Sequence, residues 1–362
     1  MSIQELQNKN STVVIQRKLP TRKKIAETLD FTPDVLLVIV DRKLEKMESV
    51  KKWLNTGSKI VYSVTAGEKL KDLDSYFGHV KKIMKLMGPV SPQRIVVVGL
   101  GGGTVGDFAG FFASTFKRGV ALVHIPSTLL AAIDSAHGGK TALNVGGIKN
   151  QVGTFYNALA IFICKDLFAS IPQTQIHSAA GELAKMALLQ GGDFFDDVKE
   201  TYFTGLDVLW KFLPQAIQSK YKVVESDPEE RSGERQVLNL GHTFGHCLES
   251  YYGIPHGTAV GLGLVFSTYW SHHHGYLSFK DQEVIIDFLH DKVGVQKRHQ
   301  FLKSRRNLSR PRLLKLVSED KKLTSSTHVN FVFLQGAGKS FRKSVTVDSF
   351  LTEAARQGWI PS

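Results

Sequence analysis

Unbroken apolar runs in the first half of the chain constrain its fold more than any other feature. They are DVLLVIVD (34–41), SKIVYSV (58–64), RIVVVGL (94–100), VALVHIP (120–126) and ALAIFIC (158–164). A strand with one face in water alternates apolar and polar residues, whereas a strand buried on both faces is apolar throughout. Residues 70–88 carry apolar residues at helical spacing and end in glycine. Strand and helix in alternation predict a parallel sheet with helices on both faces.

The second half has a different pattern. Beyond about residue 165, apolar residues recur at helical spacing, and glycine or proline separates the helical stretches. A chain of 362 residues is too long for one small core. We therefore expect an α/β domain at residues 1–165, followed by a mostly α-helical domain at residues 166–362.

The chain is basic, with 46 Lys and Arg against 33 Asp and Glu and a net charge of +13. Such a balance suits nucleic acid, acidic lipid, an anionic small substrate or simply a basic surface. The densest basic stretch is residues 297–312, and no aromatic interleaving, zinc-finger spacing or repeat indicates nucleic-acid binding. We therefore interpret 297–312 as a solvated face and expect no specific nucleic-acid partner.

The sequence also indicates a compartment. Cys164 and Cys247 have no CxxC spacing, which fits reducing conditions. The N-terminal stretch is polar, unlike a signal peptide. No apolar run approaches the ~20 residues that span a bilayer. We expect a cytoplasmic protein that has no membrane partner.

The glycine cluster GLGGGTVGDFAG (99–110) follows a predicted strand directly and opens a helix. Backbone N–H groups at such a helix N-terminus can bind a pyrophosphate, although a tight strand-to-helix turn is the alternative. The usual dinucleotide fingerprint has an acid about twenty residues after the glycines. Here the strand-end acid, Asp41, precedes them. A bound nicotinamide cofactor would therefore require a sheet order other than the usual Rossmann order.

A second glycine-rich segment, residues 126–157, lies between two apolar strands. It offers Asp134, Lys140, Lys149 and Asn150. We expect a loop whose lysines reach phosphate as point charges. A flexible surface loop is the alternative, but its length and its apolar anchors disfavour that reading.

Three histidines lie within LNLGHTFGHCLESYYGIPHG (238–257). His242 and His246 belong to neighbouring turns of one helix, and His256 begins the next element. Catalytic zinc commonly takes two histidines and a carboxylate and leaves one position open. Glu182, on an apolar helix, is a candidate carboxylate. The alternative for the histidines is a purely structural role. The alternative for Glu182 is an exposed ion pair with Lys185, three residues further along the same helix.

Arg235 and Asn239 precede His242 at helical spacing. If the helix begins early, both residues share a face with His242. Cationic and amide groups around a metal suit a phosphorylated, polyhydroxylated substrate, whereas a charged helix start is the simpler interpretation.

The motifs taken together resemble the sugar phosphate cyclases, and among them most the 3-dehydroquinate synthases. The matching segments are GGGTVGDFAGFFASTFKRG, DSAHGGKTALN, GIKNQVGTF, GELAKMAL, LNLGHTFGH and PHG. They occur in the family's order and spacing and cover roughly residues 30–345. The resemblance implies a dehydroquinate synthase-like fold, in which the first domain binds NAD and the second binds metal and substrate.

The resemblance also assigns roles to residues. It implies a catalytic divalent metal, zinc or cobalt, on Glu182, His242 and His256. It implies catalytic roles for Lys185, Arg235, Asn239 and His246. Around the substrate it places Asp134, Lys140, Asn150, Lys220 and a phosphate-facing Lys321 or Lys322. Arg118 matches an arginine that reaches the neighbouring subunit of a homodimer. NAD contacts fall on Asp41, Glu68, Lys71, Gly102, Gly103, Thr104, Asp107, Ser127, Thr128, Lys140 and Lys149.

The family's reaction is the conversion of 3-deoxy-arabino-heptulosonate 7-phosphate to 3-dehydroquinate and phosphate. It runs through transient oxidation by NAD, phosphate elimination, reduction and an intramolecular aldol closure. The metal serves as a Lewis acid, and the hydride returns within each turnover. The implied class is a carbon–oxygen lyase.

Some positions depart from the usual synthase pattern. GELAKMAL stands where AEVIKYG is common, and Lys43 replaces a frequent asparagine. The KMAL segment is similar to cyclases acting on sedoheptulose 7-phosphate or hexose phosphates, which remain alternatives, as does a metal-dependent polyol dehydrogenase. Those other cyclases alter the substrate-facing arginine and asparagine. Arg235, Asn239 and His246 all remain here, which favours a substrate that carries a carboxylate.

Overall fold

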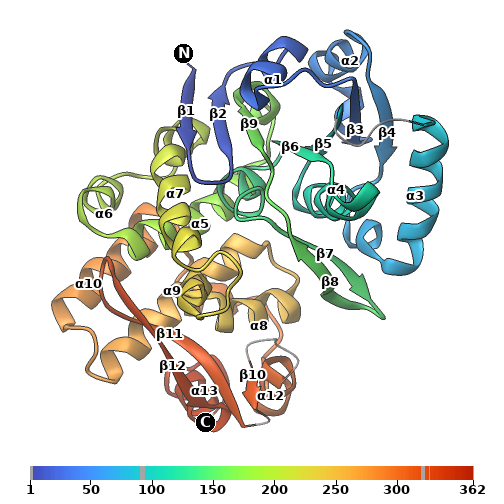
Figure 1. Ribbon diagram of the computed structural model, residues 1–362. Helices are drawn as coiled ribbons and strands as arrows, with labels where there is room; N and C mark the ends of the chain where they lie inside the picture. Colours follow the sequence, from blue (N-terminus) through green and yellow to red (C-terminus); the bar gives the residue numbers. More distant parts are fainter. Residues whose placement is uncertain (1–2, 90–93, 319–322, 326, 362) are drawn as a thin grey trace. The chain divides into compact units, whose positions relative to one another are not determined.

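The structure is a computed structural model that describes residues 3–89, 94–318, 323–325 and 327–361 (Figure 1). It divides into two compact units, Met1–Ile171 and Pro172–Ser362. The boundary predicted at residue 165 lies at the start of the 3-10 helix η6 (Lys165–Phe168), just before this division.

The first unit is built on a seven-stranded sheet in the order β1-β2-β9-β6-β5-β3-β4. Its strands are β1 (Gln4–Gln7), β2 (Thr12–Gln16), β3 (Val35–Asp41), β4 (Ile60–Val64), β5 (Ile95–Gly101), β6 (Ala121–Pro126) and β9 (Ala160–Cys164). All neighbouring strands are parallel except β1 and β2. The five apolar runs form the strands expected of them, so the predicted parallel sheet is confirmed. Strands β1 and β2 were not predicted: β1 is a largely exposed edge strand without an apolar run, and the apolar run of β2 is short.

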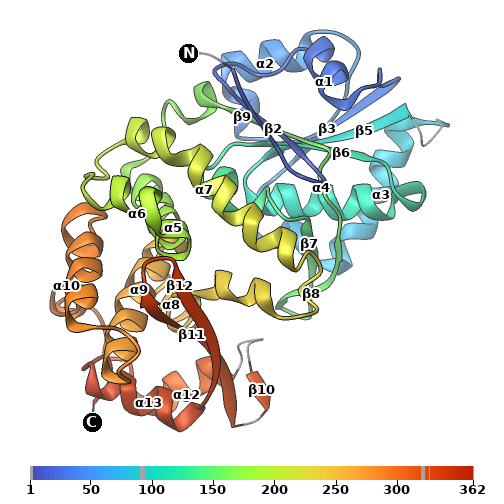
Figure 2. The same ribbon diagram turned by 60° about the vertical axis from the view of Figure 1, so that its left-hand side comes forward.

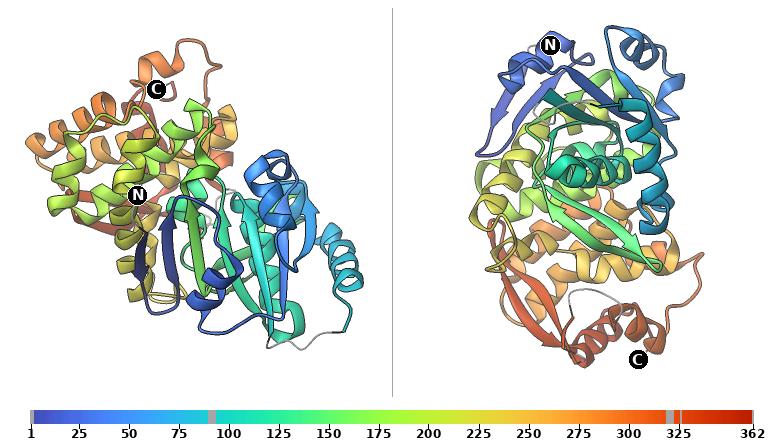
Figure 3. Two further views of the ribbon diagram at one scale, coloured as in Figure 1. Left: turned by 90° about the horizontal axis from the view of Figure 1, so that it is seen from above. Right: turned by 45° about the vertical axis from the view of Figure 1, so that its right-hand side comes forward.

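Helices cover both faces of this sheet (Figure 2). On one face, α1 (Arg22–Leu29) and α2 (Glu48–Asn55) pack Ile25, Val50 and Trp53 against the apolar side chains of the strands. On the other face lie α3 (Leu73–Met87) and α4 (Gly103–Thr115), which stand in front of the sheet in the right-hand view of Figure 3. The predicted helix ends where expected, with Gly88 in a positive-φ conformation after Met87.

The segment predicted as a loop at residues 126–157 is largely ordered into a hairpin, so that prediction was wrong. Strands β7 (Lys140–Val145) and β8 (Ile148–Phe155) pair in antiparallel fashion (Figure 1). Gly146 and Gly147 form the turn, both with positive φ. Two adjacent glycines between short strands are a hairpin signal, which the loop interpretation overlooked. Asp134 lies before the hairpin in a π-helical turn, η5 (Ala131–Ser135).

The second unit is mostly helical, as predicted. Its helices are α5 (Gln173–Gln190), α6 (Gly192–Lys199), α7 (Leu206–Ser226), η7 (Glu234–Asn239), α8 (His242–Tyr252), α9 (His256–His273), α10 (Phe279–Asp287), η8 (Phe288–Lys292), α11 (Arg298–Leu302), α12 (Arg310–Ser318) and α13 (Val347–Arg356). A small antiparallel sheet of β10 (Leu323–Ser325), β11 (His328–Gly336) and β12 (Lys339–Thr346) was not predicted. Among the described residues, no helix combines the length and the apolar character needed to cross a membrane.

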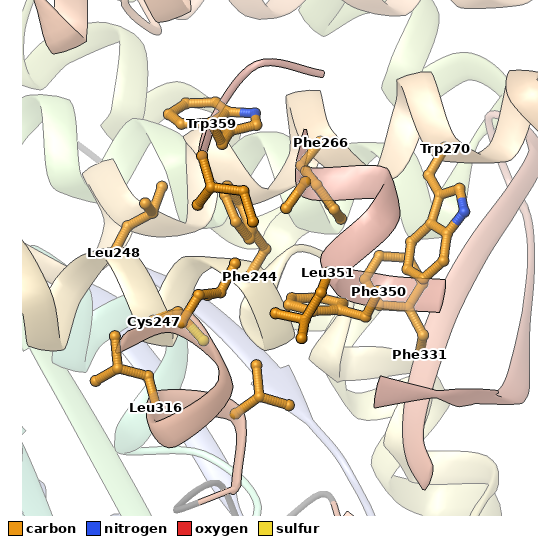
Figure 4. Packing of buried hydrophobic residues seen from close by; sticks show 14 of the residues in the cluster. Phe244, Cys247, Leu248, Phe266, Trp270, Leu316, Phe331, Phe350, Leu351 and Trp359 are labelled. Atoms are coloured by element: carbon orange, nitrogen blue, oxygen red, sulfur yellow. The ribbon is translucent and has the colours of Figure 1, made fainter. Parts of the chain in front are cut away.

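An aromatic core holds α8, α9, β11 and α13 together (Figure 4). The ring of Phe244 stacks on Phe266 with centroids 4.1 Å apart and meets Trp359 edge-to-face at 5.1 Å. Phe331 and Phe350 extend the cluster around Trp270. This packing fixes the start of α8, where His242 lies, against the middle of α9.

Glycines allow three helices of this unit to approach closely. A Cβ atom added to Gly181 on α5 would collide with the carbonyl group of Gly257 on α9. A Cβ atom on Gly257 would collide with the carbonyl oxygen of Ser178, whose hydroxyl accepts a hydrogen bond from Gly257 N at 3.0 Å. In the same way, a Cβ atom on Gly263 of α9 would collide with the carbonyl group of Gly241 before α8. The helix contacts therefore depend on glycine.

We expect the substitution Gly257→Ala to lower the free energy of unfolding by about 3 kcal/mol, because α9 must move away from the backbone of α5. Chemical denaturation would measure the loss. Gly78→Ala is the matched control: Gly78 is also helical, but an added Cβ atom there meets nothing within 4 Å. It should raise stability by roughly 0.5–1 kcal/mol. Equal effects of the two substitutions would contradict the role of the glycine contact.

Candidate active site

Helix α5 places Glu182 and Lys185 in the interior of the second unit. Both side chains are buried, at 0% and 1% exposure, and Lys185 Nζ lies 2.6 Å from Glu182 Oε2. The alternative of an exposed ion pair is therefore wrong. Helix α5 is apolar around most of its circumference. The sequence therefore has no polar face that would indicate the direction of the Glu182 and Lys185 side chains.

Three imidazoles gather beside this carboxylate. One ring nitrogen from each of His242, His246 and His256 lies within 4.8 Å of the other two. Glu182 Oε1 lies 3.4 Å from His242 Nε2 and 3.2 Å from His256 Nε2. Gly241, in the left-handed conformation, starts α8 at His242, and Pro255 starts α9 at His256. The structure thus brings the three predicted metal ligands together and adds His246 beside them.

Second contacts orient two of these rings. His242 Nδ1 lies 3.1 Å from the carbonyl oxygen of Leu240, and His256 Nδ1 lies 2.8 Å from Glu249 Oε2. In each ring Nδ1 makes this contact, so Nε2 points toward Glu182. A carboxylate behind a histidine is a common feature of metal sites. The sequence analysis missed Glu249, although its place on the helix that carries His242 was a usable signal.

Burial and charge set the protonation of this cluster. Burial and the Lys185 ammonium lower the pKa of His242 to about 3, so its ring is neutral. Burial alone would raise the pKa of Glu182, but Lys185 and His242 lower it well below its usual value. Burial lowers the pKa of His256, yet the adjacent carboxylates of Glu182 and Glu249 outweigh it and raise that pKa to about 10. The cluster therefore contains a buried anion around which positive charge collects.

The donor set fits a divalent cation. Both oxygens of Glu182 are buried and lack a hydrogen bond of regular geometry, although Lys185 pairs with one of them. Imidazole nitrogens and carboxylate oxygens are the ligands that zinc takes in catalytic sites. Two sets of three are available here: Glu182 with His242 and His256, or the three imidazoles. The first set stays our prediction.

Arg235 and Asn239 do not share a helix with His242, so the expectation of an early helix start was wrong. They lie in the 3-10 turn η7, and Leu240 and Gly241 leave helical geometry before α8 begins. The glycine supplies the left-handed residue that separates the two elements. Arg235 is nevertheless buried, at 3% exposure.

Asp227, which the sequence analysis missed, organises the loop that leads to Arg235. Its Oδ1 accepts hydrogen bonds from the backbone N–H groups of Arg231 and Ser232, at 2.7 and 3.2 Å. Its Oδ2 accepts those of Gly233 and Arg235, at 2.9 and 3.2 Å. Burial alone would raise the pKa of Asp227, but these donors lower it to about 2. The Asp227 carboxylate therefore stabilises the loop fully at pH values above its ordinary pKa, near 4. This stabilisation is lost as the pH falls through about 2, where the carboxylate becomes protonated.

A second group of predicted residues lies in the first unit, around the glycine loop. Lys71 is buried at 3% exposure, and its Nζ lies 2.5 Å from Asp107 Oδ2 and also bonds Asn150 Oδ1. Gly67 N donates to Thr104 Oγ1 at 3.1 Å. Gly102 and Gly103 open α4 directly after β5. In parallel sheets, ligands bind at this end of the strands.

Asn144 on β7 links the hairpin to this group and was missed from the sequence. Its Nδ2 donates to Glu68 Oε2 at 2.9 Å, and its Oδ1 accepts from Asn150 N at 2.9 Å. Lys149 Nζ lies 3.7 Å from Glu68 Oε1. The hairpin therefore brings Lys149 and Asn150 beside Glu68 and Lys71 of η2 (Glu68–Lys71), which the loop interpretation did not foresee.

The remaining predicted residues are distributed over both units. Asp41 ends β3, and its Oδ1 accepts from Lys43 N at 3.1 Å. Ser127 and Thr128 follow β6, next to the glycine loop in the sheet. Other predicted positions are the exposed Lys140 on β7, the exposed Arg118 at the end of η4 (Phe116–Arg118) and the buried Lys220 on α7. Lys321 and Lys322 lie outside the described residues.

The sequence matches two family models in succession. Residues 61–178 match the N-terminal model of 3-dehydroquinate synthase, and residues 179–323 match the C-terminal model. The 3-dehydroquinate synthase of Alkaliphilus metalliredigens (strain QYMF) is 35% identical over 265 residues, which are 70% of this chain and 73% of that protein. The enzyme of that name from Thermoplasma volcanium is 31% identical over 322 residues, 86% of either chain.

Solved structures share the fold. A 2-deoxy-scyllo-inosose synthase, complexed with carbaglucose-6-phosphate, NAD+ and Co2+, superposes with a TM-score of 0.81 at 22% identity, covering 99% of this chain and 100% of that one. The 2-epi-5-epi-valiolone synthase of Streptomyces hygroscopicus subsp. jinggangensis 5008, with NAD+ and Zn2+ bound, gives 0.77 at 21% identity, covering 98% and 100%. An iron-containing alcohol dehydrogenase gives 0.57 at 16% identity, covering 96% and 97%.

A parallel-sheet unit followed by a helical unit, with these family matches, defines the chain as a sugar phosphate cyclase. Enzymes of this class are carbon–oxygen lyases. Within the class, the chain belongs to the 3-dehydroquinate synthase family.

We expect Asp227→Ala to release the loop before Arg235, because the backbone donors of Arg231, Ser232 and Gly233 lose their acceptor. Amide hydrogen exchange of residues 231–235 should quicken roughly tenfold or more. Glu229→Gln removes an exposed carboxylate of the same loop and should leave the exchange unchanged. Unchanged exchange in Asp227→Ala would rule out this role.

Proposed function

We propose that the chain is a 3-dehydroquinate synthase, which converts 3-deoxy-arabino-heptulosonate 7-phosphate to 3-dehydroquinate and inorganic phosphate. NAD and one divalent metal ion are its cofactors. Relatives of that name at 31% to 41% identity support the substrate. The observation that carries the chemistry is the buried Glu182 carboxylate beside three imidazoles.

Glu182, His242 and His256 hold the metal ion, for which zinc is our choice and cobalt also suits the donor set. Glu249 keeps the ring of His256 in position through its bond to Nδ1. The neutral ring of His242 needs no deprotonation before it can act as a ligand. When bound, the metal supplies a Lewis acid for the substrate oxygens, and NAD supplies a hydride acceptor that is regenerated in each turnover.

The other site residues serve to position the substrate. Arg235, held by the loop around Asp227, binds the substrate carboxylate, and Asn239 and His246 contact its polar groups. Lys185 stands beside the Glu182 carboxylate, where its ammonium keeps the anionic form. Asp134, Lys140, Asn150 and Lys220 surround the substrate, and Lys321 or Lys322 faces its phosphate. Holding reacting groups in place in this way contributes much of the rate of such reactions.

The cofactor group in the first unit binds NAD. The open N-terminus of α4 at Gly102, Gly103 and Thr104 faces the pyrophosphate. Lys71 holds Asp107 and Asn150 in place around this loop. Asp41, Glu68, Ser127, Thr128, Lys140 and Lys149 complete the set of NAD contacts. Arg118 reaches the site of a second subunit, so that the working unit is a homodimer, in the cytoplasm.

A second candidate is a cyclase for a sugar phosphate without the carboxylate. The fold likeness to 2-deoxy-scyllo-inosose synthase, at a TM-score of 0.81, favours it. Arg235 and Asn239 oppose it, because the family resemblance associates these two residues with a substrate that carries a carboxylate. A dehydrogenase of the alcohol dehydrogenase fold would share the architecture but would release NADH.

A turnover assay separates these candidates. With 3-deoxy-arabino-heptulosonate 7-phosphate, NAD and zinc, we expect release of inorganic phosphate without accumulation of NADH. Sedoheptulose 7-phosphate and glucose 6-phosphate are the comparison substrates and should release none. Phosphate release from a comparison substrate alone would favour another cyclase, and net NADH formation would favour a dehydrogenase.

We expect His256→Ala to lose most of its bound metal, with affinity reduced at least roughly 100-fold, and nearly all turnover. The unfolding transition should stay close to that of the wild type, because the ring serves as a ligand. Metal content by atomic absorption, turnover and thermal unfolding would be measured together. His177→Ala, an exposed histidine on α5, is the control and should change none of them. Full metal content in His256→Ala would refute the ligand assignment.

A further inference from the structure

The second unit contains a hollow of about 450 Å³ on α9. Its walls come from the middle of α9, the end of α10, the turn η8, the start of α11 and the chain after α13. None of the predicted site residues lines it. A hollow of this size suits a small molecule.

The floor of the hollow is apolar and aromatic. Val265, Ile286 and Trp359 line it and are buried at 5%, 9% and 3% exposure. The ring of Tyr269, one turn beyond Val265 on α9, borders it. A ligand that fills this floor must bring an apolar side chain of its own.

Acidic and basic side chains also line the hollow. Asp287, Asp291, Lys297 and Arg298 all line the hollow. Among the residues that the structure describes, these four side chains make no ion pair, and the guanidinium of Arg298 donates only to the carbonyl oxygen of Gln357. Arg356, which also lines the hollow, is already neutralised by the buried carboxylate of Glu353 at 2.6 Å.

Tyr269, which also lines the hollow, lies near a charge of each sign. Burial raises the pKa of its hydroxyl, the charge of Asp287 raises it further, and the charge of Arg298 lowers it. One hydroxyl therefore senses an acid from α10 and a base from α11. The hollow is therefore lined by negative and positive groups that both lie near Tyr269.

We propose that this hollow binds a free α-amino acid with a large apolar side chain. Asp287 and Asp291 receive its ammonium group, Arg298 and Lys297 receive its carboxylate, and its side chain lies on Val265, Ile286 and Trp359. A phosphate or another anion would be repelled by the two aspartates, and a metal cation would be repelled by the two bases. A zwitterion satisfies both sets at once, and the planar fork of arginine suits a carboxylate.

The test measures binding of L-phenylalanine to the full chain by isothermal titration calorimetry. We expect saturable one-to-one binding. L-Phenylalaninamide lacks the carboxylate and N-acetyl-L-phenylalanine lacks the ammonium group, so each should bind at least tenfold more weakly. Absence of saturable binding, or equal affinity for all three compounds, would overturn the proposal.

Variants connect each charge of the ligand with its residue. Asp287→Asn and Arg298→Gln should each weaken L-phenylalanine binding at least tenfold, and in Asp287→Asn the free and the N-acetylated compound should bind about equally. Glu283→Gln, on α10, and Lys303→Gln, after α11, remove charges outside the hollow and are the matched controls. All four residues are exposed, and thermal unfolding would verify the fold. Binding that survives both hollow variants, or that the controls weaken as much, would exclude the site.

Discussion

The close approach of α5 to α9 is the constraint on which the candidate site depends. Gly181 and Gly257 make this contact, and each adjoins a proposed metal ligand, Glu182 or His256, in the sequence. The separation of the two helices therefore sets the 3.2 Å distance between Glu182 Oε1 and His256 Nε2. Gly241 repeats the arrangement, because it packs against α9 and directly precedes His242. Close-packed interiors transmit even small displacements, so a methyl group at any of these glycines would alter the ligand geometry.

The burial of Glu182 has an electrostatic cost that this geometry must offset. An isolated charge in an apolar interior is strongly unfavourable, and the Glu182 carboxylate on the apolar helix α5 is not exposed to solvent. Lys185 and the imidazoles offset the cost, yet a buried ion pair often contributes little to net stability. A chain selected for stability alone would have an apolar residue at this position. The buried charges are explained by the cation that they would bind, so their arrangement is evidence for function.

The sequence predicted the parts of the fold whose signals are local. The unbroken apolar runs identified the parallel strands, since burial on both faces leaves no other composition. The hairpin at 140–155 was misjudged because its glycine content was attributed to a loop, although Gly146 and Gly147 sit where a tight turn requires positive φ. The prediction that α8 begins early was also wrong. The residue spacing is helical through Leu240 and Gly241, but the backbone conformation of these two residues is not.

The candidate site divides in the same way. Residues with a chemical signature, such as the histidines, could be found from spacing and resemblance. Asp227 and Asn144 could not, because each acts on a backbone group or on another side chain rather than on a ligand. Residues of this kind carry no motif, and their partners become known only when the chain is folded.

The basic residues of segment 297–312 have different roles in the structure, although the sequence shows only a run of positive charge. The guanidinium groups of Arg305 and Arg306 lie 4.1 Å from the ring centroids of Phe301 and Tyr251, and Arg310 pairs with Asp348 at 2.6 Å. These arginines cover apolar rings and hold α12 to α13, so their charge serves packing. Lys297 and Arg298 line a hollow that two aspartates, Asp287 and Asp291, also line. The segment was interpreted as one solvated face, but Lys297 and Arg298 differ from its other Lys and Arg residues because both line a hollow.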